Sequence, residues 1–218
     1  MNTKKKILIA SKKLFREQGF GAPTLNLLAQ RIGISRGNLT YYFKDKDALL
    51  ETLAEEMWVK YEANIGRAMQ FPSWGSTNEV TKVYLELQKE YSFIFQDARV
   101  VSNPMIVEQI QRMKEDVLKR QMSTIAFSIQ IGNMNEERIP GSYRNMCELI
   151  WMVNFYWLSS ESYRKANETT SWDKLVWSLI LPYFTEKGLD SFKEHFGEVY
   201  YQSLGERFKQ NNPQMIGF

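Results

Sequence analysis

Apolar positions recur at helical spacing through the first third of the chain. The first run occupies positions i, i+3, i+7 and i+8 of one helical face, at Ile7, Ala10, Leu14 and Phe15. Gly19 is the predicted C-cap of this helix. A stripe of about six turns follows a capping Asp45 and consists of Leu50, Leu53, Met57, Tyr61 and Ile65. The pattern therefore predicts an N-terminal helix and a long helix that begins near residue 45.

Two short helices are predicted between these elements. One begins at Thr24 and ends at Gly33, and its inward positions are apolar: Leu27, Leu28 and Ile32. The other is capped by Ser35 and runs through Phe43. Because only a tight turn joins the two helices, residues 24–46 (TLNLLAQRIGISRGNLTYYFKDK) have the pattern of a helix-turn-helix.

The rest of the chain also shows helical periodicity. Helices are predicted over residues 78–97, 104–131, 142–167, 172–187 and, on a weaker pattern, 189–209. Asn103 followed by Pro104 is a typical helix start, and Pro182 predicts a kink. The cluster FPSWGST at residues 71–77 predicts a turn. No segment alternates with period two, so we predict an all-α fold.

The predicted helices over 142–167 and 172–187 are apolar nearly all round. In the first, one face carries Met146, Leu149, Ile150, Val153 and Trp157, and a second carries Cys147, Trp151, Phe155 and Leu158. In the next, the two sets are Trp172, Leu175, Val176, Leu179, Ile180 and Tyr183, and Trp177, Leu181 and Phe184. One domain can bury one face of each helix, so the second face predicts a partner. The alternative is that both helices lie deep in the core of a monomer.

Composition excludes several classes of protein. The chain is 44% hydrophobic, enough for a large core, but its apolar runs are shorter than the roughly 18 residues that span a bilayer. Its basic start precedes only the short apolar stretch ILIA, unlike a signal peptide, so we expect a cytoplasmic protein. One cysteine and one histidine, Cys147 and His195, form no disulfide or zinc cluster. We expect a buried thiol, a surface histidine, and no metal or cofactor.

Charge is distributed unevenly along the chain. Residues 1–50 contain ten Lys and Arg against three acidic residues, which gives +7, so the remainder of a chain of net charge +3 carries −4. A basic N-terminal segment followed by a mildly acidic remainder is expected when a small N-terminal domain binds a polyanion such as a nucleic acid. A solvated charged face is the alternative interpretation.

The second short helix has two chemically different sides. Projection at 100° per residue places Leu39 and Phe43 together, facing the preceding helix. The outer side and its flanks carry Arg36, Gly37, Asn38, Thr40, Tyr41 and Tyr42. A guanidinium, an amide, a hydroxyl and two phenols on two turns of helix suit a DNA major groove.

Each candidate residue also has a structural interpretation. Gly37 would let the backbone approach DNA closely, or it is a tolerated weak point in the helix. Either Tyr41 or Tyr42 could pack its ring into the small domain. Lys46, near the start of the long helix, could be an ordinary surface lysine.

Residues 7–50 resemble the N-terminal DNA-binding domain of TetR/AcrR regulators. The matching positions are Leu14, Phe15, Gly19, Phe20, Thr24, Ala29, Gly33, Ile34, Ser35, Gly37, Leu39, Tyr42, Phe43, Lys46 and Leu49. Two positions depart from the family pattern, because Thr40 stands where Tyr is common and Pro23 where Thr is frequent. Each departure puts one DNA contact in doubt without affecting the fold.

The resemblance implies which residues face DNA. They are Thr24, Ser35, Arg36, Asn38, Tyr41, Tyr42 and Lys46, to which we add Gly37 for its close approach. Thr24, Tyr42 and Lys46 can hold phosphates. Arg36 and Asn38 have the donors to read base edges.

The resemblance also implies an organisation for the whole chain. Residues 1–48 would be a three-helix DNA-binding domain, joined by the long helix to a helical effector-binding and dimerisation domain over 49–218. The helices at 142–167 and 172–187 would build the dimer interface. An effector pocket would lie within 78–167, a region rich in aromatic residues and methionines, where Asn154 or Gln130 could supply polar groups.

The function implied is that of a repressor that binds a pseudo-palindromic operator as a homodimer and is released by a small, largely apolar effector. One alternative is an architectural DNA-binding protein that senses nothing, which would bind without sequence preference. The other is an all-helical enzyme, but the sequence has no nucleophile–base pair, phosphate loop or metal-ligand spacing.

Overall fold

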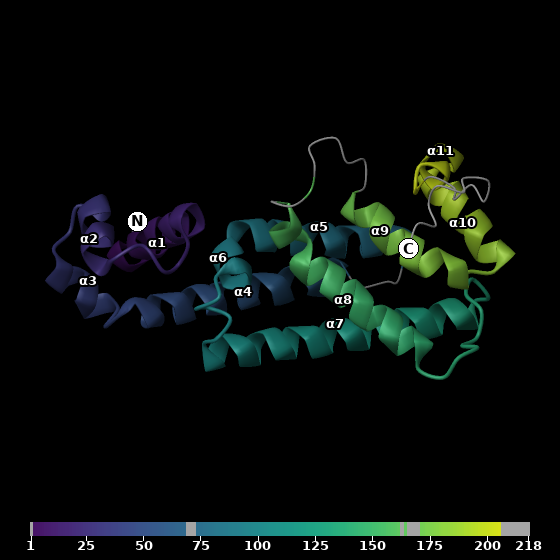
Figure 1. Ribbon diagram of the computed structural model, residues 1–218, viewed down its shortest axis with the longest axis horizontal. Coiled ribbons are helices and arrows are strands. Elements are labelled where there is room, and N and C mark those ends of the chain that lie inside the picture. Colours follow the sequence, from purple (N-terminus) through teal and green to yellow (C-terminus); the bar gives the residue numbers. More distant parts are fainter. Residues whose placement is uncertain (1, 69–72, 162–163, 165–170, 206–218) are drawn as a thin grey trace, which may run out of the picture. The chain divides into compact units, whose positions relative to one another are not determined.

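The computed structural model of the chain describes residues 2–68, 73–161, 164 and 171–205 (Figure 1). The described residues are 77% helical and contain no strand, which confirms the predicted all-α class. The first elements are α1 Thr3–Gln18, α2 Leu25–Ile32, α3 Arg36–Tyr42, α4 Lys46–Ala68, α5 Trp74–Glu90 and α6 Ser92–Gln96. The later ones are α7 Pro104–Gln130, α8 Ser142–Ser160, α9 Trp172–Ile180, η1 Leu181–Tyr183, α10 Glu186–Phe196 and α11 Glu198–Gln202.

The chain divides into two compact units. The first comprises Met1–Arg120 with Asn154–Tyr163, and the second comprises Gln121–Val153 with Arg164–Phe218. In the first unit α1 contacts α2, α4 and α6, and α4 packs along α5.

The N-terminal helices enclose a small apolar core. Its buried side chains include Ile7, Leu14, Phe15, Leu28, Leu39 and Phe43. The inward positions predicted for α2 and α3 are thus confirmed at Leu28, Leu39 and Phe43, whereas Leu27 and Ile32 are only partly buried. The predicted stripe of α4 is confirmed throughout, because Leu50, Leu53, Met57, Tyr61 and Ile65 are all buried. Asp45 caps this helix by accepting the Ala48 N–H at 2.8 Å.

The segment predicted as a turn followed by one helix over 78–97 has a different structure. Helix α5 begins at Trp74, because Ser73 and Ser76 form a capping box. The predicted turn is therefore wrong from residue 74 on, and residues 71 and 72 lie outside the described part. The helix also breaks at Tyr91, which has non-helical torsions and a fully buried side chain.

Helix α8, whose residues up to Val153 belong to the second unit, has both a buried and an exposed apolar side. Met146, Cys147, Ile150 and Trp151 are buried. Leu149 and Met152 are about half exposed, so the exposed apolar face differs from the two faces read from the sequence. The described helix ends at Ser160, and residues 162–163 and 165–167 of the predicted 142–167 helix lie outside the described part.

Helix α7 begins at Pro104, as predicted, after an Asn103 side chain that accepts the Met105 N–H.

The predicted helices over 172–187 and 189–209 have the wrong boundaries. Pro182 ends α9 in a 3-10 turn rather than kinking a continuous helix. Helix α10 then starts at Glu186, because the Thr185 hydroxyl oxygen accepts the Gly188 N–H at 3.1 Å. Gly197, with a φ of 91°, separates α10 from α11.

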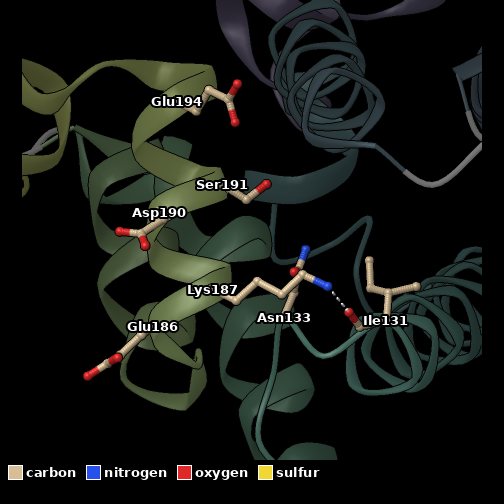
Figure 2. Close-up of a pocket in the computed structure, with 7 residues that line it drawn as sticks. All are labelled: Ile131, Asn133, Glu186, Lys187, Asp190, Ser191 and Glu194. Atoms are coloured by element: carbon tan, nitrogen blue, oxygen red, sulfur yellow. Dashed lines mark hydrogen bonds between the residues drawn. The ribbon is translucent and has the colours of Figure 1, made fainter.

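Helix α10 docks closely on the α7–α8 connection. A Cβ on Gly188 would lie 2.0 Å from the Asn133 carbonyl oxygen, so no other residue fits there without rearrangement. The Lys187 ammonium donates to the Ile131 carbonyl at 2.6 Å (Figure 2). Three carboxylates of α10, from Glu186, Asp190 and Glu194, line an open groove beside this contact.

The cysteine and the histidine lie where the sequence predicts. Cys147 is fully buried, and burial raises the pKa of its thiol to about 11, so little reactive thiolate forms near neutral pH. His195 is exposed on α10. Within the described ranges, no helix is both long and apolar enough to cross a membrane.

Candidate nucleic-acid interface

Side-chain caps define the helix-turn-helix. The Thr24 hydroxyl oxygen accepts the Leu27 N–H at 3.2 Å, which starts α2. Gly33 ends it in the left-handed region, at φ 75° and ψ 35°, where glycine is favoured. The Ser35 hydroxyl oxygen accepts the Asn38 N–H at 3.1 Å and starts α3. Thr24 and Ser35 therefore have a structural role as N-caps, and each keeps a hydroxyl hydrogen that a phosphate could accept.

Helix α3 separates an apolar side from a polar one. Leu39 and the following Phe43 are buried. The other side is exposed at five of the predicted positions: Arg36, Gly37, Asn38, Tyr41 and Tyr42. The structure thus brings these five residues onto one accessible surface, which we call the α3 face.

The two tyrosines lie on the outside of the small domain. Tyr41 is 83% exposed and Tyr42 is 36% exposed, so neither ring is buried in the core. Their rings contact each other edge to face, with centroids 5.2 Å apart. This contact holds both phenol groups at the C-terminal end of α3 and orients them before any partner binds.

Thr40, one departure from the family pattern, is only partly exposed. Its hydroxyl donates to the carbonyls of Arg36 and Gly37, both at 3.1 Å. This hydrogen is therefore used within α3, and Thr40 offers a weaker donor to an outside partner than the tyrosine it replaces.

Lys46 binds the protein's own backbone. Its ammonium donates to the carbonyls of Phe20, Gly21 and Pro23 at 2.6, 3.1 and 3.1 Å. It also lies 4.5 Å from the centre of the Phe20 ring. Burial, followed by the nearby charge of Arg99, lowers its pKa. Lys46 thus fixes the loop that leads into α2, and a phosphate contact would require it to release at least one of these carbonyls.

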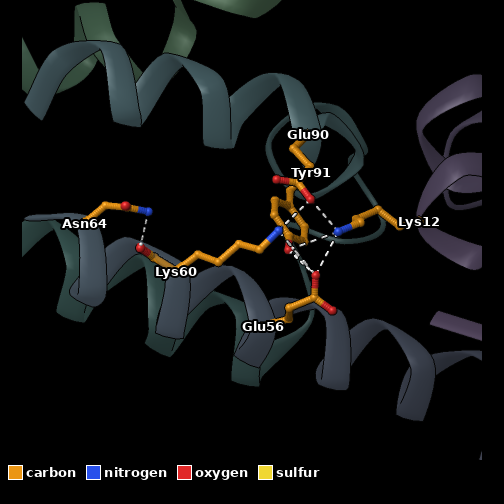
Figure 3. Close-up of polar contacts among 6 residues, drawn as sticks. All are labelled: Lys12, Glu56, Lys60, Asn64, Glu90 and Tyr91. Atoms are coloured by element: carbon orange, nitrogen blue, oxygen red, sulfur yellow. Dashed lines mark hydrogen bonds and ion pairs between the residues drawn. The ribbon is translucent and has the colours of Figure 1, made fainter. Parts of the chain in front are cut away.

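A polar cluster connects α1 to α4 and α5 (Figure 3). Lys12 of α1 pairs with Glu56 of α4 at 2.7 Å and with Glu90 of α5. The Tyr91 hydroxyl donates to Glu56 at 2.6 Å, and Lys60 pairs with Glu90 at 2.7 Å. We call these five residues the Lys12 cluster. Sequence reasoning missed it, and no local pattern could reveal it, because Lys12 lies 44 and 78 positions from its two carboxylate partners.

Mutual attraction outweighs burial in the Lys12 cluster. Burial by itself raises the pKa of Glu56 and of Glu90, but the hydrogen bonds and charges of Lys12 and Lys60 hold both values below 4.5. Burial lowers the pKa of Lys12, yet the two carboxylates raise it above 10.5. The cluster is therefore charged across the physiological range and ties three helices together.

A second contact joins the loop before α2 to the segment after α6. The carboxylate of Asp97 accepts the N–H groups of Phe20 and Gly21 at 2.9 and 3.1 Å. Together with the Lys12 cluster, this contact makes the position of the helix-turn-helix depend on α4, α5 and α6.

Family comparison covers most of the chain. Residues 7–53 match the model described as bacterial regulatory proteins, tetR family, and residues 53–192 match the model described as bacterial transcriptional repressor. A curated relative is the uncharacterized HTH-type transcriptional regulator YhgD of Bacillus subtilis (strain 168). It is 28% identical over 139 residues, which are 61% of this chain and 72% of the relative.

Solved structures share the fold. A TetR-family transcriptional regulator from Marinobacter aquaeolei VT8 superimposes with a TM-score of 0.77 at 20% identity, over 89% of this chain and 97% of that one. AibR in complex with isovaleryl coenzyme A and operator DNA gives a TM-score of 0.61 at 11% identity, over 84% of this chain and 98% of that one.

Proposed function

The chain belongs to the tetR family of bacterial regulatory proteins and is a helix-turn-helix transcriptional regulator, and we propose that it is a repressor of a ligand-responsive kind. In this proposal it binds a pseudo-palindromic operator as a homodimer, in the cytoplasm, and a small, largely apolar effector releases it. The α3 face is the observation that carries the DNA-binding part, because it exposes base-reading and phosphate-binding groups on one short helix.

We assign different tasks to the residues at this surface. Arg36 and Asn38 have several hydrogen-bond donors and would read base edges in the major groove. Thr24, Ser35, Tyr41 and Tyr42 would contact the backbone or flank the bases, and Gly37 would allow the helix to approach closely. Lys46 would act on phosphate only after leaving a carbonyl of the loop before α2.

The dimer would form through α8 and α9. Leu149, Met152 and Tyr156 are 51, 52 and 59% exposed and follow one another at i, i+3 and i+7, so they share a face of α8. Leu175 of α9 is also exposed. Large apolar side chains exposed in this pattern favour burial against a second copy of the chain. The two-fold axis of such a dimer would match a two-fold operator.

The effector would bind within residues 78–167. Buried aromatic residues of this region include Tyr84, Phe93 and Phe95. Asn154 has a buried side-chain oxygen, whereas Gln130 is exposed, so Asn154 is the better candidate for a polar contact. The AibR complex, which contains both isovaleryl coenzyme A and operator DNA, supports an effector role for this fold.

Selection of duplexes from a random pool tests the DNA-binding proposal. The full-length protein is incubated with the pool at physiological salt, and bound duplexes are amplified and sequenced over several rounds. We expect convergence on an inverted repeat. Recovery without any consensus would instead support an architectural DNA-binding protein.

A further inference from the structure

Arg99 places an exposed cation against the loop that leads into α2. The residue lies between α6 and α7, where its backbone N–H donates to one carboxylate oxygen of Asp97 at 3.0 Å. The other oxygen of Asp97 accepts the N–H groups of Phe20 and Gly21. A Cβ on Gly21 would lie 2.7 Å from Nη1 of Arg99 and 3.2 Å from its Cζ. The guanidinium therefore lies on the loop between α1 and α2.

The guanidinium of Arg99 has no acidic partner. Arg99 is exposed, and within the part of the chain that the structure describes its side chain forms no ion pair and no hydrogen bond. Asp97 is close in sequence, but both of its carboxylate oxygens accept backbone N–H groups. The five N–H donors of the guanidinium are thus available to an external acceptor.

A second cation, the ammonium of Lys46, lies at the same loop. It donates to three carbonyls within residues 20–23, so it is occupied by the protein itself. Burial lowers its pKa, and the charge of Arg99 lowers it further, by more than either Asp47 or Asp97 raises it. The fold therefore holds two cations together at one loop, which is unfavourable in the free protein and favours a bound anion.

The chemistry of this loop suits a phosphate group. A planar guanidinium presents parallel N–H donors that match phosphate, and Arg99 can use them without giving up a contact inside the protein. Thr24, three residues after Gly21, is exposed and caps α2, and its hydroxyl hydrogen remains unused. A phosphate near Thr24 would therefore be drawn to Arg99, whereas Lys46 would first have to release a carbonyl.

We propose that Arg99 binds a backbone phosphate of the operator, so that the segment between α6 and α7 is part of the DNA interface. This inference rests on the proposed DNA-binding function and extends its contact surface beyond the helix-turn-helix. It also transfers to Arg99 the phosphate contact that the sequence assigns to Lys46. Because the phosphate is the same at every base pair, Arg99 should add affinity without sequence preference.

The salt dependence of DNA binding tests this inference. Anisotropy titrations of the full-length protein with a selected and a scrambled duplex are run over a series of KCl concentrations. In Arg99→Gln, the affinity for both duplexes should fall by one common factor of about ten at fixed salt. The slope of log affinity against log salt should decrease by about 2 for the dimer, because each copy loses one phosphate contact.

Two matched variants separate a local contact from an effect of net charge. Arg112→Gln removes the same charge from α7, where Arg112 is exposed and paired with Glu108, and should keep the wild-type slope. Arg99→Lys keeps the charge but not the planar group, so it should restore most of the slope. An equal loss of slope in Arg99→Gln and Arg112→Gln, or no loss in either variant, would overturn the inference.

Two measurements on the free protein test other roles of Arg99. Since Arg99→Gln removes a cation that no carboxylate pairs, the variant should melt at or above the wild-type temperature. A clear drop in melting temperature would show that Arg99 supports the fold and would overturn the inference. Inorganic phosphate is then added at constant ionic strength. If it stabilises the wild type alone, and Arg99→Gln keeps the wild-type DNA slope, the loop binds free phosphate and the DNA assignment is wrong.

Discrimination between duplexes distinguishes this inference from the proposed function. If Arg36→Ala loses the preference for the selected duplex while Arg99→Gln keeps the wild-type slope, specific DNA recognition stands and the role of Arg99 is wrong. If the wild type prefers no duplex but Arg99→Gln still lowers the slope, Arg99 binds phosphate and the sequence-specific function is wrong.

Discussion

At the residue scale, the free protein already presents the α3 face to solvent. Leu39 and Phe43 hold α3 against the core of the small domain through their buried side chains. On the exposed side, the Tyr41 and Tyr42 rings contact each other edge to face. The backbone of α3 is thus in place before binding, and a surface that needs no refolding has a lower entropic cost of forming specific contacts.

Arg36→Ala should weaken specific DNA binding without affecting the fold, because the side chain is exposed at the start of α3. One direct base contact contributes about 1–3 kcal/mol of discrimination. Titration of selected and scrambled duplexes at fixed salt measures the difference. Arg31→Ala, which removes an exposed arginine of α2, serves as the control and should leave discrimination intact. Unchanged discrimination in Arg36→Ala would remove Arg36 from the recognition set.

Gly37→Ala should separate stability from binding. A Cβ at this position would meet only Ser35 Oγ, at 3.9 Å, so the free protein has room for it. Helix propensity should then raise the free energy of unfolding by about 0.5–1 kcal/mol, whereas a close approach to DNA should make operator affinity fall. Denaturant unfolding and DNA titration measure the two effects. If affinity is retained, Gly37 is a tolerated weak point.

Sequence could predict the α3 face but not every role on it. The caps Thr24 and Ser35 and the buried Leu39 follow from local spacing, which the sequence records directly. The hydrogen bonds of Lys46 to Phe20, Gly21 and Pro23 form only because the tertiary fold brings a loop that lies more than 20 residues earlier in the sequence next to the start of α4. Such tertiary contacts have no local pattern.

At the element scale, the Lys12 cluster is the ionic connection between α1 and the helices α4 and α5. The Lys12 side chain is 16% exposed, and the two carboxylates are about one third exposed. Such a pair is stronger than a surface ion pair but is still screened by water. A shift of α4 or α5 on effector binding would change these contacts and thereby move α1.

Lys12→Met should lower the free energy of unfolding by about 1–2 kcal/mol, because it leaves the partly buried Glu56 and Glu90 with Lys60 as their one shared cation in place of two. Chemical denaturation at neutral pH measures the loss. Lys13→Met is the matched control, since Lys13 is 66% exposed and lies 4.0 Å from Glu17, and it should change stability little. Equal effects of the two variants would show that Lys12 contributes no more to stability than an exposed lysine.

The difference between wild type and Lys12→Met should depend on pH. The folded-state pKa values of Glu56 and Glu90 lie below 4.5, so their stabilisation is present above that pH and is lost as pH falls through the folded values. Lys12 has a raised pKa, so its contribution is present below 10.5 and is lost only above the raised folded value. The stability gap should therefore be flat near neutrality and shrink in acid, as the pH falls below 4.5 and through the folded-state values.

Helix existence was more predictable than helix boundaries. Asp45 and Asn103 sit directly before apolar periodicity, and both act as caps. The break at Tyr91 has no Gly or Pro signal in the sequence, so the local pattern could not place it. Pro182 marks the region where α9 ends, but the sequence pattern did not separate a kinked helix from a new helix that starts at the Thr185 cap.

At the scale of the whole molecule, the proposal requires two copies of the chain. Met152→Glu should convert the dimer into a monomer at micromolar concentration, because it places a charge in the proposed apolar interface. Val199→Glu makes the same change at an exposed apolar residue of α11, outside the proposed interface, and should stay dimeric. Sedimentation of both variants decides this, and a wild-type monomer would refute the dimer itself.

Hydroxyl-radical footprinting on a selected duplex tests the central claim most directly, because it reports dimerisation and recognition through the α3 face together. We predict two protected patches of equal extent, related by a two-fold axis. Their centres should lie about 34–36 Å apart along the DNA, or a multiple of that distance. A single protected patch would contradict an operator read by two copies of α3. Uniform protection along the duplex, without a two-fold axis, would contradict it too.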